Sequence, residues 1–332
     1  METFVIVTII LALIFDFING FHDSANAIAT VVATKVLSPL KAVTMAAVFN
    51  LIGPLVFGTA IASMIGKGII DTKIITVNLI FAALIGAVVW DLITWYFALP
   101  TSSSHALVGG LVGAAIASSG LGSVHASGVE TIVLFMVVSP IIGLVTAFIF
   151  ALLVMKAFRK AHPSKINHYF RRLQLFSAAF YSLTHGTNDA QKTMGVIAIL
   201  LVSQSSDPIG ATNLHIPFWV IVSCAAAIGL GTFSGGWRIV KTMAQRVTRL
   251  RPYQGFCAET SSGIVLAVMA AMGIPVSTTH VISSSIMGVG ATDKLSAVRW
   301  GIARKIMGAW VLTIPMAALI SAAVFLIMKA MF

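Results

Sequence analysis

Residues 100–114, "PTSSSHALVGGLVGA", decide how the rest of this chain can be threaded through a membrane. The stretch opens on a proline and four consecutive hydroxyl side chains, and the apolar segment that follows this proline, 101–118, falls short of the roughly 20 residues of a full span. A near copy, "PVSTTHVISSSIMGV", follows at residues 275–289. We therefore expect each stretch to form the tip and returning arm of a re-entrant helical hairpin that lines a cavity.

The composition around these stretches is that of a membrane protein. Of the 332 residues, 58% are hydrophobic and 9% are charged, and the mean hydropathy is +1.00. These values exclude an ordinary soluble domain, and the many long apolar runs indicate a polytopic all-α membrane protein. The formal net charge of +11 sits in short loops and not in a soluble basic module, so no nucleic-acid partner is expected.

A second pair of similar stretches shows that the chain is duplicated. "GFHDSANAIAT" at residues 20–30 is matched by "GTNDAQKTMGV" at residues 186–196, an offset of 166. The two proline-led stretches are offset by 175, so order and approximate spacing are both kept. Two similarities in register indicate two repeats of one architecture.

The positive charges predict which loops face the cytoplasm. Segments 35–41, 156–172, 238–251 and 293–305 carry 17 of the 21 Lys and Arg residues. Because cytoplasmic loops are enriched in these residues, we place all four segments inside and the basic-poor connections outside. This assignment works only if the first proline-led stretch does not cross the membrane.

Counting crossings then makes the two repeats inverted. The first repeat is 1–155, with crossings near 3–34, 42–65 and 129–155 and a hairpin at about 74–118; a basic cytoplasmic linker at 156–172 joins it to the second repeat, 173–332, which has its hairpin at about 255–291. Three crossings are an odd number, so the second repeat enters with opposite orientation. The chain is expected to be a multi-pass protein of the cytoplasmic (inner) membrane with both termini external.

Two carboxylates occupy equivalent positions in the repeats. Asp23 and Asp189 each follow a glycine by three residues, and intramembrane carboxylates are costly unless they face a cavity or a partner. We expect Gly20 and Gly186 to interrupt their helices. Exposed backbone carbonyls at such breaks suit a cation or a proton relay, together with nearby amide side chains. The amides are Asn19, Asn26, Asn188 and Gln191.

The hairpin tips carry the residues expected to bind an anion. A proline followed by hydroxyls at the start of a half-helix offers free N–H groups, a positive dipole end and O–H donors directed at one point. A compact tetrahedral oxyanion fits such a cluster, although helix capping alone is the alternative. The hydroxyls are Ser102, Ser103, Ser104, Ser277, Thr278 and Thr279.

Further polar residues fall inside apolar segments. His105 and His280 close the two tips, and His185 precedes the second repeated glycine. Asp91 and Glu259 lie on the ascending hairpin arms and are candidates for proton or cation coupling, with structural ion pairing as the alternative.

Lys192 breaks the symmetry of the repeats. It stands where the first repeat has Asn26, so its ammonium group can pair with Asp189 or with a substrate, or replace a bound cation. The two cysteines lack partner spacing, and no cofactor or resident metal is expected.

These motifs resemble the inorganic phosphate transporter (PiT) family, and most of all its short bacterial members. The resemblance rests on "GFHDSANAIATVVATKVLSP", "LPTSSSHALVGG", "HGTNDAQKTMGVIA" and "IPVSTTHVISSSIMG", spread over the whole chain. It implies cation-coupled symport of inorganic phosphate by a homodimer with no enzymatic activity. It assigns phosphate and cation binding to Asp23, Asn26, Asp189 and the six tip hydroxyls, and a functional role to Glu259.

The chain also departs from the pattern of sodium-coupled members. Those members have "GANDVAN" at the first repeated motif, where this chain has His22, and a small residue and Asn at the second, where it has Gln191 and Lys192. The departures favour protons as the coupling ion, and a neutral metal–phosphate complex as a possible substrate. Sodium coupling and sulfate transport stay open. An aspartyl hydrolase is disfavoured because neither Asp23 nor Asp189 directly follows a glycine.

Overall fold

The computed structural model describes residues 2–56, 58–204 and 215–331. Within these ranges the chain is helical, and the only β pairing is the isolated bridge between Ile70 and Val124. The expected all-α polytopic class is confirmed. Five described helices are long and apolar enough to cross a membrane, and a sixth span is possible if one bent helix pair counts as a unit.

In the first half of the chain, the described residues form six helices and two short 3-10 turns. They are α1 (Glu2–Ala33), α2 (Pro39–Val56), α3 (Ala60–Lys67), η1 (Thr72–Ile74), α4 (Val77–Tyr96), α5 (Ser103–Ser119), η2 (Leu121–Ser123) and α6 (Ala126–Ala157). The second half follows a similar order of long and short elements. They are α7 (Pro163–Gln204), α8 (Phe218–Ser234), α9 (Trp237–Lys241), the π-helical η3 (Thr242–Val247), α10 (Pro252–Ala271), α11 (Thr278–Ala291), η4 (Leu295–Ala297) and α12 (Trp300–Met331).

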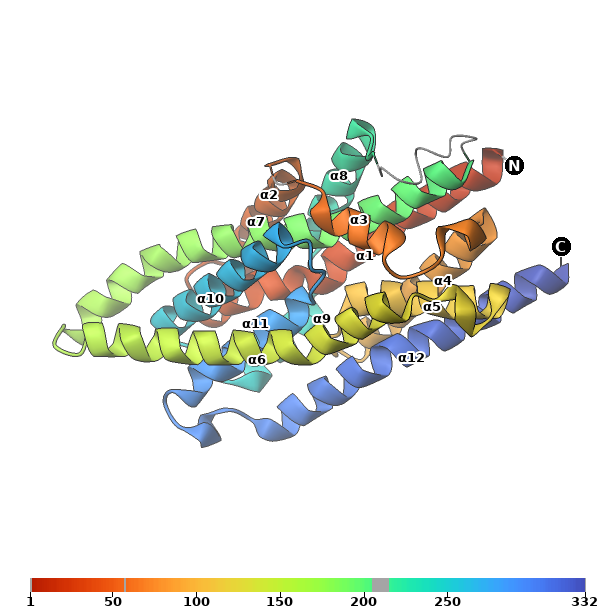
Figure 1. Cartoon of the computed structure of the whole chain (residues 1–332). Helices are drawn as coiled ribbons and strands as arrows, with labels where there is room; N and C mark the ends of the chain where they lie inside the picture. The colour runs from red at the N-terminus through yellow and green to blue at the C-terminus, as the bar shows by residue number, and fades with distance from the viewer. Residues whose placement is uncertain (1, 57, 205–214, 332) are drawn as a thin grey trace.

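Two helix pairs occupy the positions expected for the hairpins. Helices α4 and α5 pack against each other, as do α10 and α11. Each returning arm also packs against the last long helix of the other half: α5 lies on α12, and α11 lies on α6. The two halves of the chain are therefore interleaved. Figure 1 shows both termini at one end of the molecule and the turn between α6 and α7 at the other.

The long helices α1 and α7 run without interruption. The expected breaks at Gly20 and Gly186 are wrong, because both glycines lie inside continuous helices. Their lack of a side chain serves packing instead. A Cβ atom on Gly20 would collide with the Ile228 carbonyl of α8, and one on Gly186 would collide with Asn50 of α2. Small residues that let helix backbones approach are common in membrane bundles.

The interruptions come one helix later in each half. Helix α2 contains Pro54 and ends at Val56, so the expected crossing 42–65 is divided between α2 and α3. Helix α8 ends at Ser234, and the chain bends by 56° into α9 and η3. Gly235 makes this bend with φ of +70°, a left-handed conformation that favours glycine.

Close helix packing at α5 generates a stability prediction. A Cβ atom at Gly113 would lie within 3.0 Å of three backbone atoms of Ala318 on α12. Gly113→Ala should therefore push the two helices apart at a cost of about 1–3 kcal/mol, as overpacking does elsewhere. We expect a lower thermal unfolding midpoint of the detergent-solubilised protein, measured by intrinsic fluorescence.

Gly308→Ala is the matched control. This residue is exposed on α12, and a Cβ atom there meets nothing within 4 Å. Alanine also has the higher helix propensity, so the control should hold or raise the midpoint. Equal midpoints for the two variants would contradict the close approach of α5 and α12.

Candidate functional site

The two hairpin tips meet near the middle of α1 and α7. In each tip the first hydroxyl is the helix N-cap: Ser102 Oγ accepts from the His105 amide at 3.2 Å, and Ser277 Oγ accepts from the His280 amide at 3.1 Å. These two residues thus do what serine commonly does at a helix start. Capping uses only the first of the three predicted hydroxyl residues in each tip. The other two residues of each tip are not needed for capping.

The hydroxyls of the second tip bind the two repeated aspartates. Thr278 Oγ1 donates to Asp189 Oδ2, and Thr279 Oγ1 donates to Asp23 Oδ2, both at 3.0 Å. The Asn26 side-chain amide donates to Thr279 Oγ1 at 2.9 Å. Helix α11 therefore begins between α1 and α7 and contacts the acid of each repeat.

Lys192 joins both tips to α7. Its Nζ donates to Asp189 Oδ1 at 2.7 Å and to the Val276 carbonyl at 3.1 Å, and it is also hydrogen-bonded to Ser104 Oγ. The side chain is 1% exposed, so the ammonium group is held by protein oxygens in place of water. A carboxylate, a hydroxyl and a carbonyl are the kinds of ligand that also bind small hard cations.

His22 and Asp23 form a hydrogen-bonded pair on α1. His22 Nδ1 lies 2.6 Å from Asp23 Oδ1, while Nε2 lies 3.2 Å from Thr94 Oγ1 and 3.4 Å from Thr101 Oγ1. Both threonines belong to the first hairpin, so His22 links the first hairpin to Asp23. An imidazole and a carboxylate at this distance can share one proton.

Three ligand atoms surround the centre of the cluster. One oxygen of Asp23, one ring nitrogen of His185 and one oxygen of Asp189 lie within 4.8 Å of one another. All three side chains are at most 2% exposed. The carboxylates of Asp23 and Asp189 carry two negative charges against the one positive charge of Lys192. One more positive charge would therefore balance the cluster.

The tips also contact each other directly. The rings of His105 and His280 meet edge to face with centroids 4.8 Å apart, and His280 stacks on Trp310 of α12 at 3.9 Å. The Trp310 indole donates to the Pro100 carbonyl at 2.9 Å. The N-termini of α5 and α11, with their free N–H groups and positive dipole ends, therefore converge on one region.

The two acids expected on the hairpin arms lie in different surroundings. Asp91 is fully buried close to the first tip, and neither of its oxygens has a hydrogen-bond partner among the described residues. Glu259 accepts from Gln174 Nε2 at 3.0 Å and from Ser177 Oγ. It lies 12 residues, or about 18 Å along the helix, before the end of α10 that leads to the tip, so it belongs to a separate cluster.

Two predicted amide ligands face away from the central cluster. Gln191 Oε1 accepts from the Ile61 amide at 3.0 Å and so caps the first turn of α3. The Asn188 amide donates to the carbonyls of Thr184 and Leu266 at 2.8 and 3.3 Å. Both bind backbone groups of neighbouring turns or helices, which is the local role of such residues in helices.

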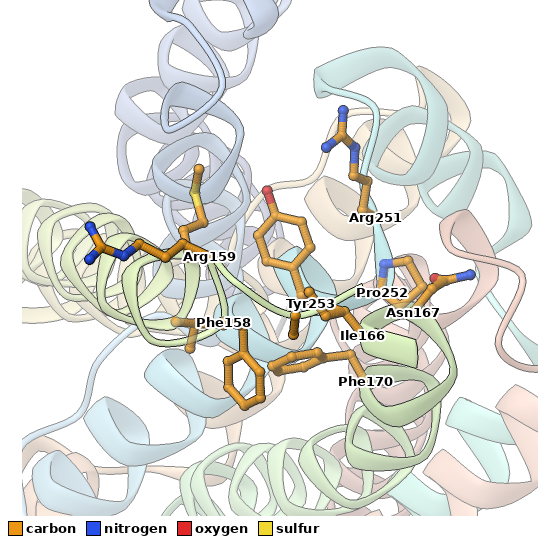
Figure 2. Close-up of a pocket in the computed structure, with 11 residues that line it drawn as sticks. Phe158, Arg159, Ile166, Asn167, Phe170, Arg251, Pro252 and Tyr253 are labelled. Atoms are coloured by element: carbon orange, nitrogen blue, oxygen red, sulfur yellow. The ribbon is translucent and has the colours of Figure 1, made fainter. Parts of the chain in front are cut away.

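A cavity of about 520 Å³ lies elsewhere, where α6, α7 and α10 come together (Figure 2). Its lining combines aromatic rings such as Phe158, Phe170 and Tyr253 with Arg159 and Arg251. No tip hydroxyl and no repeated aspartate lines it. The polar cluster at the tips is instead closed off from solvent, with all six hydroxyl residues at most 8% exposed.

Comparison with known proteins identifies the family. A model described as "Phosphate transporter family" matches residues 19–321. The chain belongs to this family. It is 53% identical to a probable low-affinity inorganic phosphate transporter of Rhizobium meliloti (strain 1021), covering 95% of this chain and 93% of the relative. It is 44% identical to a protein of the same description from Bacillus subtilis (strain 168), covering 98% of each.

A solved structure has the same fold. "The sodium-dependent phosphate transporter" superposes with a TM-score of 0.92 and 25% identity, covering 99% of this chain and 100% of that one. Together with the family match, this confirms the resemblance read from the four motifs. The phosphate transporter family consists of transporters and not of enzymes, which excludes the aspartyl hydrolase.

Sequence reasoning did not assign a role to several polar residues that contact the predicted ones. Thr94 contacts His22, Gln174 contacts Glu259 in the separate cluster, and nothing in the sequence distinguishes either of them. Thr101 also contacts His22, and it is the first of the four tip hydroxyls, of which only the other three are predicted anion ligands. Asp16 is a different case. The structure buries this carboxylate fully. Its position at the end of the first apolar run is a signal in the sequence, because a carboxylate in a membrane segment is by itself a candidate functional residue.

The position of Thr279 generates a second stability prediction. Thr279→Val keeps the shape of the side chain but removes the donor to Asp23 and the acceptor of the Asn26 amide. Leaving buried polar groups unpaired costs about 1–3 kcal/mol. We expect a lower thermal unfolding midpoint than in the wild type, and we expect Thr279→Ser to restore most of it. If the valine variant is as stable as the wild type, Thr279 does not hold α1 to the second tip.

Proposed function

We propose that this chain imports inorganic phosphate across the cytoplasmic membrane together with protons. The family and its low-affinity inorganic phosphate transporters support phosphate as the substrate. The structural neighbour supports coupling to a cation, since that protein is described as sodium-dependent. The choice of protons over sodium rests on residues of this chain.

The tip cluster has the chemistry to bind phosphate. Helix N-termini and hydroxyls donate to phosphate oxygens, and Lys192 supplies a positive charge beside Ser104. The carboxylates of Asp23 and Asp189 can accept the O–H groups that a protonated phosphate keeps. Fully ionised sulfate has no such O–H group, so the same carboxylates would repel it.

The observation that carries the choice of coupling ion is the position of Lys192. Its ammonium group occupies an oxygen-lined position between Asp189 Oδ1, Ser104 Oγ and the Val276 carbonyl. A sodium ion bound to Asp189 would need these oxygens. The ammonium group of Lys192 therefore takes the place of a sodium ion that would otherwise bind beside Asp189 and be transported.

Charge balance requires further positive charge during transport. Moving each negative charge inward against a membrane potential costs about 2.3 kcal/mol per 100 mV. Phosphate also enters a cluster that already holds two carboxylates. Protons delivered to carboxylate and imidazole groups of the cluster reduce both costs.

A neutral metal–phosphate complex is a second form of the substrate. The ligand atoms of Asp23, His185 and Asp189 lie within 4.8 Å of one another, a spacing that suits a divalent cation. Such a cation would travel as cargo with phosphate and would neutralise it.

Uptake by proteoliposomes tests the proposed function. With labelled phosphate outside at acidic pH, we expect accumulation that collapses at least tenfold with a protonophore and does not change when sodium replaces potassium. Addition of Mg²⁺ tests the metal–phosphate substrate, and accumulation should then rise. Tenfold excess sulfate should compete weakly.

Three results would contradict parts of this proposal. Strict sodium dependence would exclude proton coupling, and efficient competition by sulfate would exclude phosphate selectivity. Absence of phosphate uptake from a folded, reconstituted protein would exclude the function itself.

Replacement of Lys192 tests its role as an attached cation. Lys192→Asn removes the ammonium and supplies an amide oxygen, so phosphate uptake should become dependent on sodium. Lys192→Leu removes the ammonium group without supplying an oxygen ligand for sodium. We expect its phosphate uptake to be at least tenfold lower than that of the wild type in both sodium and potassium buffers. An active Lys192→Asn variant that is indifferent to sodium would show that the ammonium does not replace a transported ion.

A further inference from the structure

We propose that Asp16 is a separate proton-binding site that gains and loses a proton during each transport cycle. The inference rests on the proposed function and extends it to a residue outside the tip cluster. Asp16 lies on α1 seven residues before Asp23, about 10 Å along the helix toward the end of the molecule that holds both termini (Figure 1).

The surroundings of Asp16 do not suit a permanent charge. The side chain is fully buried, and its neighbours along α1, Ala12 and Phe15, belong to the buried apolar core. Thr193 Oγ1 of α7 donates to Asp16 Oδ1 at 3.0 Å, and the Cys224 thiol of α8 faces the same carboxyl group. One hydroxyl and one weak thiol donor are little compensation for a buried carboxylate.

Two orphaned oxygens indicate where a proton resides. Asp16 Oδ2 and Asn19 Oδ1 are both buried, and apart from the weak Cys224 thiol beside the Asp16 carboxyl group neither has a hydrogen-bond partner among the described residues. The residues are three apart on α1, so their side chains lie on the same face of the helix. Two acceptors cannot satisfy each other, but a proton on Asp16 turns one of them into a donor. The neutral acid therefore fits the arrangement seen here.

The groups facing Asp16 connect its protonation to the substrate. Asp189 and Lys192 of α7 act on it electrostatically, and Cys224 is the titratable group facing it from α8. Thr193, which binds Asp16, directly follows Lys192 in the chain. Phosphate at the tips adds negative charge beside these residues and makes ionisation of Asp16 more costly. Phosphate and the proton therefore favour each other's binding, as coupled transport requires.

Asp16→Asn tests this role because asparagine imitates the neutral acid. Two rates are compared: phosphate accumulation driven by a pH gradient, and phosphate–phosphate exchange at equal pH on both sides. We expect the first divided by the second to fall at least tenfold in the variant. Exchange needs no net proton movement, whereas accumulation does. The charge carried per phosphate, measured by electrophysiology on a solid-supported membrane, should fall by one. Asp16→Glu should keep the wild-type ratio and charge.

Thr193→Val provides a second and milder test. It removes the hydroxyl that stabilises ionised Asp16, so the proton is held to higher pH and the pH profile of uptake should move upward by about 0.5–1 unit. Thr193→Ser should leave the profile unchanged. This variant keeps the proposal testable if Asp16→Asn does not fold.

The outcomes separate this inference from the proposed function. A wild-type protein that shows no accumulation under a pH gradient overturns the proposed function. Suppose instead that the wild type accumulates phosphate and that Asp16→Asn has the same ratio of accumulation to exchange and the same charge per phosphate. That result overturns only the role of Asp16. An unchanged pH profile for Thr193→Val also overturns it.

Discussion

A buried positive charge that must be compensated holds this structure together. Lys192 has almost no contact with solvent, so its ammonium group needs protein oxygens, and it finds them on α7 and on both hairpin tips. Removing one partner from a buried ion pair commonly costs 3–5 kcal/mol. The paths of α5, α7 and α11 are therefore constrained at one point, and the repeated aspartates take their places around it.

Local patterns predicted the class, the hairpin helices and most of the central cluster. Proline followed by hydroxyls has a direct conformational meaning at a helix start, and Ser102 and Ser277 cap α5 and α11 as that pattern predicts. The course of α1 and α7 could not be predicted in this way. A glycine in an apolar helix signals a break and a close approach equally well, and only the packing of α8 against Gly20 decides between them.

Repeat symmetry identifies only residues that have a counterpart in the other half. Asp23 and Asp189 match each other, whereas the position 166 residues after Asp16 is Ser182, so symmetry gives no support to Asp16. Gln191 and Asn188 show the opposite error. They are next to Asp189 and Lys192 in sequence, but the helix turns their side chains toward α3 and α10. Sequence proximity does not decide which face of a helix a residue occupies.

The stack of His280 on Trp310 affects how independently the two hairpin tips can move. Trp310 also holds the Pro100 carbonyl, and His280 touches His105, so α12 ties the two tips to each other. Separating the tips breaks the contact between His105 and His280 and at least one of the two contacts with Trp310, and packed interfaces of this kind switch between discrete arrangements. The stack on α12 therefore couples the positions of the two tips. Under the proposed function, coupled movement of the tips would prevent a continuous path for ions from opening past both of them at once.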